Sequence, residues 1–148
     1  MGQMQDEYDK TDFATLYYDS REKTCLVIAM ARRGRARGDI GEPVVVTDAD
    51  FDSRIGGLLL QFLDSYRTRV WSQEIAYRGG TPQEERAFIK KHLSVGVARP
   101  PSGDLVITPL HHEKGGYTGK ESEQIIVPGR DVPDKIAPTL RKAFSIAT

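Results

Sequence analysis

Apolar residues along the chain fall into short runs separated by turn-forming residues, and into two longer stretches with a helical period. The runs at 14–19, 24–30 and 43–47 are rich in β-branched and aliphatic side chains, a composition typical of strands. In the stretch 50–66, apolar side chains recur every three or four positions: Phe51, Ile55, Leu58, Leu59, Phe62, Leu63 and Tyr66. This spacing predicts a helix with one apolar face turned to a core.

The same order of elements returns in the second part of the chain. Strand-like runs occupy 94–99, 104–108 and 124–128, and a helical pattern covers 131–146. Leu26-Val27-Ile28 aligns with Leu105-Val106-Ile107, and Ile55 aligns with Ile136. A single unit of this kind would leave a sheet face exposed, so two units are expected to pool their apolar faces. The sequence predicts an α+β fold of two β-β-β-α halves, an internal repeat sharing one core, with a mainly antiparallel sheet and helices packed on it.

These patterns divide a single domain, 1–148, into four segments. Residues 1–13 are expected to form a flexible acidic end, followed by the first half at 14–66. Residues 67–92 form a connector, and 93–148 form the second half. Within the connector, 68–80 show no pattern that assigns a structure.

Three local signals set helix ends. Thr81 followed by Pro82 and Glu84 predicts the start of a short helix that ends near His92. Thr47, with Asp50 three residues later, has the form of a capping box. Pro138 would disrupt the interior of a helix, so a turn is expected at 133–137 and the last helix near Pro138.

Composition and charge narrow the function classes. The 148 residues include 21 Lys and Arg and 21 Asp and Glu, and this balance disfavours a protein built mainly to coat nucleic acid. Cys25 is the single cysteine, which excludes an internal disulfide, and its apolar neighbours indicate a small core residue. The apolar runs are too short to cross a membrane, no secretory signal is visible, and the expected location is the cytoplasm.

Acidic residues follow the third predicted strand. Asp48, Asp50 and Asp52 could hold Mg²⁺ for phosphoryl transfer, or they could simply be acids at a helix N-terminus, where the helix dipole favours them. The histidines do not predict a metal site, because adjacent His111 and His112 would point to opposite faces of a strand. No cofactor is expected. The stretch 115–120 lacks the residues of a phosphate-binding loop and is interpreted as a flexible hairpin loop.

The densest positive charge is a Gly- and Arg-rich segment at 32–38. Its four guanidinium groups, from Arg32, Arg33, Arg35 and Arg37, could bind phosphates or the carboxylates of a protein partner, or could belong to a solvated loop. The long loops 32–41 and 111–123 correspond to each other in the repeat, and we expect them at one edge of the sheet.

The two halves together resemble the CdiI-type immunity proteins of bacterial contact-dependent growth inhibition. The resemblance spans about 16–144. It rests on the strand pair Leu16-Tyr17-Tyr18 and Leu26-Val27-Ile28, on Asp52-Ser53-Arg54-Ile55-Gly56 leading into an apolar helix, and on Leu105-Val106-Ile107-Thr108-Pro109 followed by a Gly-rich loop, Ile125-Ile126-Val127 and a terminal helix.

This resemblance implies a cytoplasmic, non-enzymatic protein that binds and neutralises the C-terminal toxin domain, commonly a nuclease, of a CdiA-type protein. No membrane contact or direct nucleic-acid binding is expected. The candidate toxin-binding residues are Arg32, Arg33, Arg35, Arg37, Glu42, Asp48, Asp50, Asp52, His111, His112, Lys114 and Tyr117. Two alternatives stay open: an RNA-binding module that uses the arginines of 32–38 with Tyr117 stacking on a base, and a Mg²⁺-dependent phosphoryl-transfer enzyme at Asp48 and Asp50.

Overall fold

A computed structural model describes residues 10–33, 36–70 and 81–148. The strands are β1 (Asp12–Asp19), β2 (Thr24–Arg33), β3 (Ala36–Thr47), β4 (Leu93–Arg99), β5 (Leu105–Glu113), β6 (Gly116–Gly119) and β7 (Ile125–Val127). The α-helices are α2 (Asp48–Ser65), α3 (Pro82–Lys91) and α4 (Ile136–Ile146), and short 3₁₀ turns lie at η1 (Tyr66–Thr68), η2 (Glu121–Glu123) and η3 (Gly129–Asp131).

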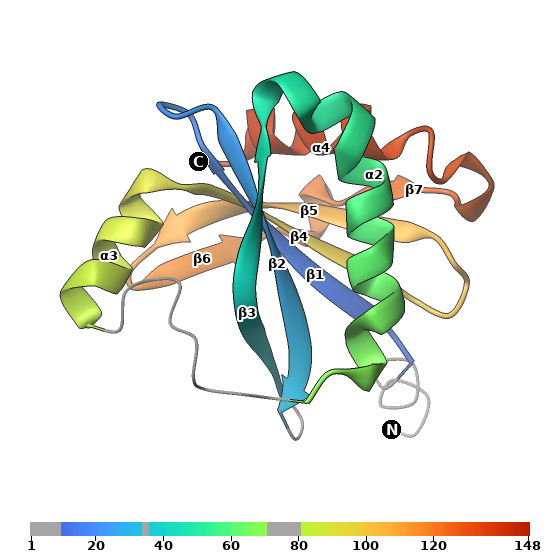
Figure 1. The fold of residues 1–148 in the computed structure, drawn as a ribbon, viewed down its shortest axis with the longest axis horizontal. Helices are drawn as coiled ribbons and strands as arrows, with labels where there is room; N and C mark the ends of the chain where they lie inside the picture. Colours follow the sequence, from blue (N-terminus) through green and yellow to red (C-terminus); the bar gives the residue numbers. More distant parts are fainter. Residues whose placement is uncertain (1–9, 34–35, 71–80) are drawn as a thin grey trace.

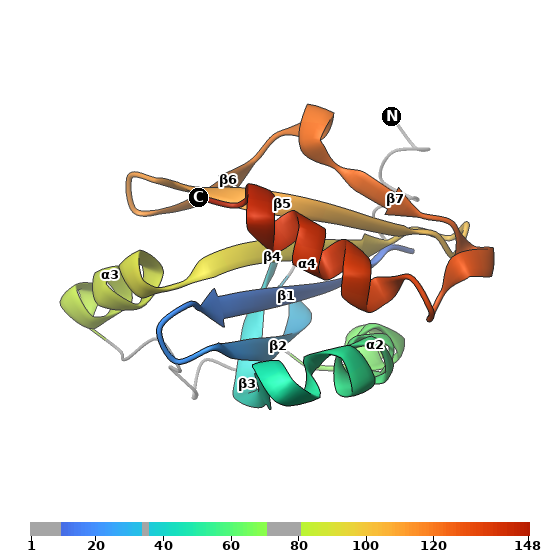
Figure 2. The ribbon, with the colours of Figure 1, turned by 90° about the horizontal axis from the view of Figure 1, so that it is seen from above.

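The strands form one antiparallel sheet in the order β3-β2-β1-β4-β5-β6, and β7 pairs with β5 on a separate branch. The sheet is strongly twisted and curls on itself, so that β3 and β5 cross at a large angle (Figure 1, Figure 2). The predicted α+β class with an antiparallel sheet and packed helices is confirmed.

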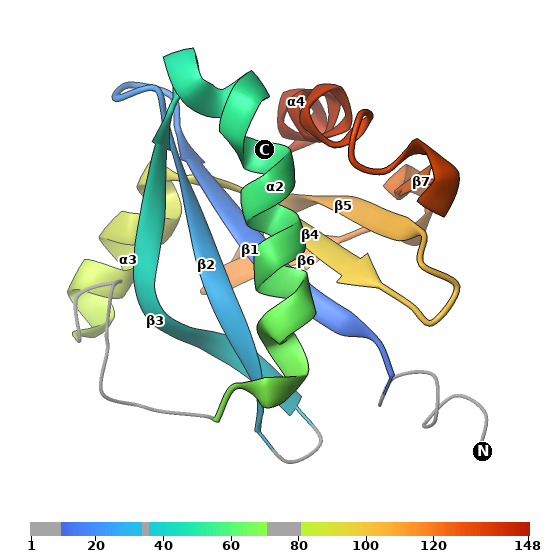
Figure 3. The same ribbon diagram turned by 45° about the vertical axis from the view of Figure 1, so that its right-hand side comes forward.

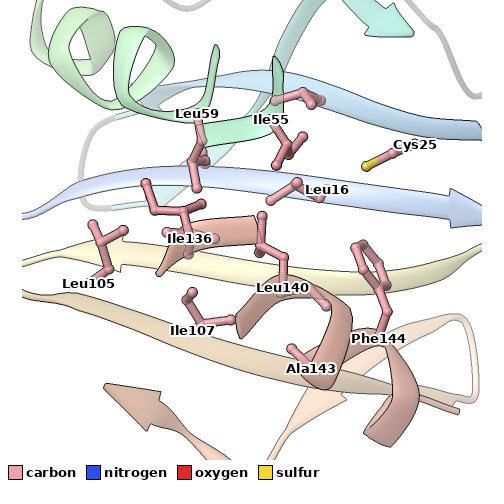
Figure 4. Close-up of a cluster of buried hydrophobic side chains, with 14 of the residues drawn as sticks. Leu16, Cys25, Ile55, Leu59, Leu105, Ile107, Ile136, Leu140, Ala143 and Phe144 are labelled. Atoms are coloured by element: carbon pink, nitrogen blue, oxygen red, sulfur yellow. The ribbon is translucent and has the colours of Figure 1, made fainter. Parts of the chain in front are cut away.

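Helices α2 and α4 lie together on one face of this sheet (Figure 3). Ile55 and Leu59 of α2 and Ile136 and Leu140 of α4 are fully buried against inward side chains of the strands, among them Leu16. Figure 4 shows these side chains meeting between the two helices and the sheet. Cys25 is also buried there, as predicted, and burial raises the pKa of its thiol to about 12.

The opposite face of the sheet carries the alternate residues of the same strands. Because side chains along a strand alternate between faces, Tyr17 points away from α2 and α4 while its neighbour Leu16 points toward them. Helix α3 packs at one end of this second face, where the ring of Phe88 meets Tyr17 edge-on with centroids 5.1 Å apart. We call the second face the open face.

Both long loops of the sequence prediction are largely strand. Strand β2 continues to Arg33, and β3 begins at Ala36. The two strands pair up to this end, with Ala31 opposite Gly38 and Arg33 opposite Ala36. Likewise, β5 continues to Glu113 and pairs with β6 from Leu110–Gly119 to Glu113–Gly116. The loop predictions at 32–41 and 111–123 were wrong because pairing of backbone groups in a hairpin tolerates glycine and charge when the side chains are solvated.

Smaller differences concern element ends. Strand β1 begins at Asp12, so the last two residues of the predicted flexible end are ordered in the sheet. Thr47 is the N-cap of α2, but its side chain makes no capping hydrogen bond, so the capping box was wrong there. The box at Thr81 is present: the Glu84 amide donates to Thr81 Oγ1 at 3.1 Å. Helix α4 begins at Ile136, which leaves Pro138 in its first turn, where no backbone donor is lost.

The alignment of Leu26 with Leu105 that the sequence suggests joins residues on opposite faces of the sheet. Cys25 and Val27 face the helices in β2, and Leu105 and Ile107 do so in β5. A shift of one residue exchanges the faces of a strand, and the apolar residues on both faces of β2 hide such a shift in the sequence.

Candidate functional site

The residues predicted to bind a toxin lie in three separate places. Arg32, Arg37 and Glu42 lie on β2 and β3; Asp48, Asp50 and Asp52 lie in the first turns of α2; and His111, His112, Lys114 and Tyr117 lie on the β5–β6 hairpin. The Arg33 side chain and the whole of Arg35 lie outside the described residues. The expectation that the two hairpin segments lie at one edge was wrong, because β3 and β6 end opposite sides of the strand order.

The acidic residues at the start of α2 join the two helices of the covered face. Asp52 accepts a hydrogen bond from Arg141 Nε at 2.8 Å, and Asp48 Oδ1 lies 3.6 Å from another nitrogen of the same guanidinium. The Asp52 carboxylate raises the pKa of Arg141, whose guanidinium also lies 4.6 Å from the Phe51 ring centroid. Two of the three acids thus have an internal cation, and Asp50 is exposed.

His112 and Tyr117 contact backbone carbonyls at the C-terminal end of α3. The Tyr117 hydroxyl donates toward the carbonyls of Ile89, at 3.1 Å, and His92, at 2.9 Å, while His112 Nε2 also contacts the Ile89 carbonyl. Carbonyls at the end of a helix lack part of their intrahelical hydrogen bonding, and the Ile89 carbonyl has only a long backbone bond, from the His92 amide at 3.4 Å, so these side chains add donors there. The ring of Tyr117 packs on His112 and on Tyr17, with centroid distances of 5.0 and 5.9 Å, and is half-buried.

His111 lies between a hydroxyl and a carboxylate. Its Nδ1 is 2.6 Å from Thr148 Oγ1, and its Nε2 is 2.6 Å from Glu123 Oε1. A hydroxyl, an imidazole and a carboxylate in a row are the groups of a nucleophilic triad. Here the Thr148 amide donates to the Leu110 carbonyl, and the Thr148 carbonyl accepts from the His112 amide, so the row fastens Thr148 alongside β5.

Of the two arginine side chains that the structure describes in the segment 32–38, Arg32 is half-buried and Arg37 is exposed. Arg37 lies on β3, and its guanidinium carbon is 3.8 Å from the centroid of the Phe13 ring, a cation–π contact with β1. A guanidinium stacked by its face keeps its edge donors available for hydrogen bonds. Within the described parts of the chain, Arg37 has no salt bridge.

The open face contains a groove of about 380 Å³ to which β1 to β6 all contribute. We call it the open-face groove; its lining includes Phe13, Thr15, Met30, Arg37, Gly96, Ala98, Val106, Thr108, Leu110, Lys120, Glu121 and Gln124. The volume is in the range of sites that bind drug-sized molecules. Curling of the sheet is what brings Arg37 of β3 and Lys120, just after β6, to the same groove.

Sequence reasoning missed this groove, although one signal was present. Gly96 and Ala98 occupy alternate positions of β4, where the other central strands carry larger side chains. A Cβ atom placed on Gly96 would meet no atom of a described residue within 4 Å. Small residues at alternate positions of a central strand leave room above that strand, and here the room faces away from α2 and α4.

Sequence reasoning also missed a cluster of charged side chains around Asp12, the first residue of β1. Asp12 accepts from Arg99 Nε and Nη2 at 3.0 and 2.8 Å and from Arg67 Nε at 3.0 Å, and Arg99 also donates to Asp64 at 2.7 Å. Although burial alone would lower it, the pKa of Arg99 is raised by Asp12 and Asp64. These contacts tie β1 and β4 to the end of α2, which is a structural task.

Neither a metal cluster nor a membrane-spanning helix is present in the described ranges. In 10–33, 36–70 and 81–148, His, Cys, Asp and Glu side chains do not gather in threes that could hold a metal ion. Nor does any helix in those ranges combine the length and apolar character required to cross a membrane.

Comparison with known proteins supports the fold. No family model matches the chain, and no curated protein matches it. A solved structure, the protein of unknown function NMB0488 from Neisseria meningitidis, superposes with a TM-score of 0.70 at 18% identity, over 95% of this chain and 97% of that one. At this identity the likeness shows a shared fold.

Proposed function

We propose that this protein is an immunity protein that binds and neutralises the C-terminal toxin domain, a nuclease, of a CdiA-type contact-dependent growth inhibition protein, acting in the cytoplasm. The supporting observation is the open-face groove. One face of the sheet is filled by α2 and α4, and the same strands present a recess to the surroundings on the other. A rigid recess that accepts a side chain of the partner is the usual centre of a tight protein interface.

The charged residues outside the groove suit the rim of such an interface. Glu42 on β3, Asp50 on α2 and Lys114 in the turn between β5 and β6 are all exposed. Charges at a rim contribute to the rate of association and to partner choice more than to affinity. Asp48, Asp52, His111 and Tyr117 instead make the internal contacts described above, so we give them structural roles.

The direct test uses the polypeptide encoded next to this protein's gene. Its C-terminal domain should bind the purified protein as a stable complex, and its nuclease activity should fall in proportion to the complex formed. Titration calorimetry and a nucleic-acid cleavage assay measure the two effects. If the neighbouring polypeptide neither binds nor loses activity, the proposed function is wrong.

We also propose that the chain is an internal repeat of two β-β-β-α halves. Ile55, Leu59 and Leu63 are buried along α2, and Ile136, Leu140 and Phe144 are buried along α4 at the same spacing. In addition, β1 and β4 pair around Thr15 and Gly96 as two antiparallel neighbours would in a twofold arrangement. The repeat would be wrong if, with β1–β2 superposed on β4–β5 in an experimental structure, α2 did not overlay α4.

A further inference from the structure

We propose that the open-face groove is the anchor site for the toxin, and that it takes an apolar side chain next to a carboxylate, from an acidic segment of that partner. This inference rests on the proposed function and adds the place and the chemistry of recognition.

The charges around the groove favour an anion. Arg37 and Lys120 lie on different walls, and neither forms a salt bridge with another residue in the described ranges. Glu121 also lines the groove, so these charges sum to one positive in a chain whose formal net charge is zero. Asp48 and Asp52 at the start of α2, by contrast, already share the guanidinium of Arg141.

The geometry of Arg37 prepares it for a carboxylate. The contact with the Phe13 ring, 3.8 Å from the guanidinium carbon to the ring centroid, restrains Arg37 at the groove and reduces the freedom lost when a ligand binds. A guanidinium edge and a carboxylate match as two parallel hydrogen bonds. Lys120 is exposed at the end of β6 and supplies a second, more mobile cation.

The lining between the two cations is apolar or small. Met30, Val106 and Leu110 give it aliphatic surface, and Gly96 leaves the space above β4 open. The polar hydroxyl of Thr15 is already directed to Met30 Sδ, at 3.0 Å. An occupant with an apolar body and an adjacent carboxylate would match both parts of this lining.

A first experiment needs no knowledge of the toxin. N-acetylphenylalanine, which has an apolar ring and a carboxylate, is titrated into the ¹⁵N-labelled protein, and N-acetylphenylalanine amide is the neutral comparison. N-acetylphenylalanine should shift the backbone amide resonances of Gly96 and Ala98 several-fold more than the neutral ligand does. Gly96→Leu, which fills the groove, should abolish the shifts. Gly57→Leu, an identical change on the exposed side of α2, should leave them unchanged.

Either of two results would overturn the groove proposal in that experiment. One is the absence of shifts at Gly96 and Ala98 at millimolar ligand. The other is equal response to the acid and the neutral amide, which would mean that Arg37 and Lys120 do not select an anion.

A second experiment uses the toxin domain. The double variant Arg37→Glu with Lys120→Glu should weaken the complex at least tenfold, and Gly96→Leu should do the same without a change of charge. The control pair Arg54→Glu with Lys142→Glu makes the same charge change at exposed positions on α2 and α4, and should bind as the wild type does. Circular dichroism confirms that each variant is folded.

The outcomes separate the two proposals. If the wild type binds the toxin and the groove variants bind equally well, the groove proposal is wrong and the proposed function stands. If the wild type does not bind the toxin, the proposed function is wrong, and the titration with N-acetylphenylalanine still decides whether the groove selects apolar anions.

Discussion

The two faces of the sheet use the same strands for different purposes. Along β1, Leu16 is fully buried under α2 and α4, while Thr15 on the open face lines a groove. The covered face is filled with closely packed apolar side chains, most of them aliphatic, whereas the open face combines small residues, aromatic rings and charged side chains at its edges. Because side chains alternate along a strand, residues that stabilise the fold and residues available for binding lie on opposite faces of the sheet. A substitution on one face can therefore leave the other face intact.

The largest loss of stability is expected from a truncation in the core under α2 and α4. Leu140 has no exposed surface between α4 and the sheet, so Leu140→Ala should lower the free energy of unfolding by about 3 kcal/mol, as in other buried leucine truncations. Urea denaturation followed by circular dichroism measures it. The comparison variant, Leu110→Ala on the half-buried open face, should cost clearly less; equal costs would mean that both faces carry the fold.

A smaller loss is expected from the charge cluster at the start of β1. Asp12→Asn leaves Arg99 without its buried carboxylate, and should cost about 2 kcal/mol, below the full cost of a broken buried pair because Arg67 is half exposed. The same denaturation experiment checks it. Asp64→Asn, which removes the exposed acid on Arg99, is the matched control and should cost much less. A negligible effect of Asp12→Asn would mean that the cluster does not hold β1 to α2.

The contact between α3 and the open face should respond to loss of one hydroxyl. Tyr117→Phe keeps the ring packing but removes the donor to the Ile89 and His92 carbonyls, with an expected cost of about 1 kcal/mol. The loss should be local, so amide hydrogen exchange should speed up in α3 and not in α2 or α4. Uniformly faster exchange would show that α3 and the core unfold as one unit.

Acid should weaken the protein partly through Asp19. Burial would raise the pKa of this carboxyl, but the Glu22 amide, the Lys91 side chain and the Arg21 amide together hold it below its ordinary value. A carboxyl with a lowered folded pKa stabilises the native state above its unfolded pKa, and this contribution is lost as pH falls through the folded value. Asp19→Asn should therefore reduce stability at neutral pH and flatten its decline in acid. An unchanged pH dependence in thermal unfolding would contradict this.

The sequence predicted the parts of the fold that have a simple period. The apolar stripe from Phe51 to Leu63 and the apolar runs of the central strands predicted the helix and strand positions, because burial of one face dictates those spacings. Tyr66, the last residue of the predicted stripe, lies beyond α2 and packs with Phe13 and Met30. The hairpin ends around Arg37 and Tyr117 were predicted as loops, since neither their glycines nor their charges carry an apolar signal. They are strands because each pairs with a neighbour that the core fixes in place.

The candidate site was less predictable than the fold. Arg37 was among the predicted residues, but its relation to Lys120 depends on the curl of the sheet, which no local pattern specifies. Asp48 and Asp52 were reasonable candidates by residue type, yet their partner, Arg141, lies far away in sequence. Long-range contacts of this kind decide whether a charged residue is available for binding.

The smallest effect on stability is expected at the floor of the open-face groove. At a packed position Gly→Leu would force neighbours apart, but a side chain on Gly96 would extend into the groove, and leucine suits a strand at least as well as glycine. Gly96→Leu should therefore change the free energy of unfolding by less than about 1 kcal/mol in urea denaturation. Gly119→Leu is the contrasting variant: a Cβ there would lie 2.7 Å from a methyl group of Thr108, so it should destabilise the β5–β6 hairpin. If Gly96→Leu lowered the free energy of unfolding more than Gly119→Leu, the space above β4 would not be available to a ligand. The two faces of the sheet would then not differ in the way proposed, one stabilising the fold and the other free to bind.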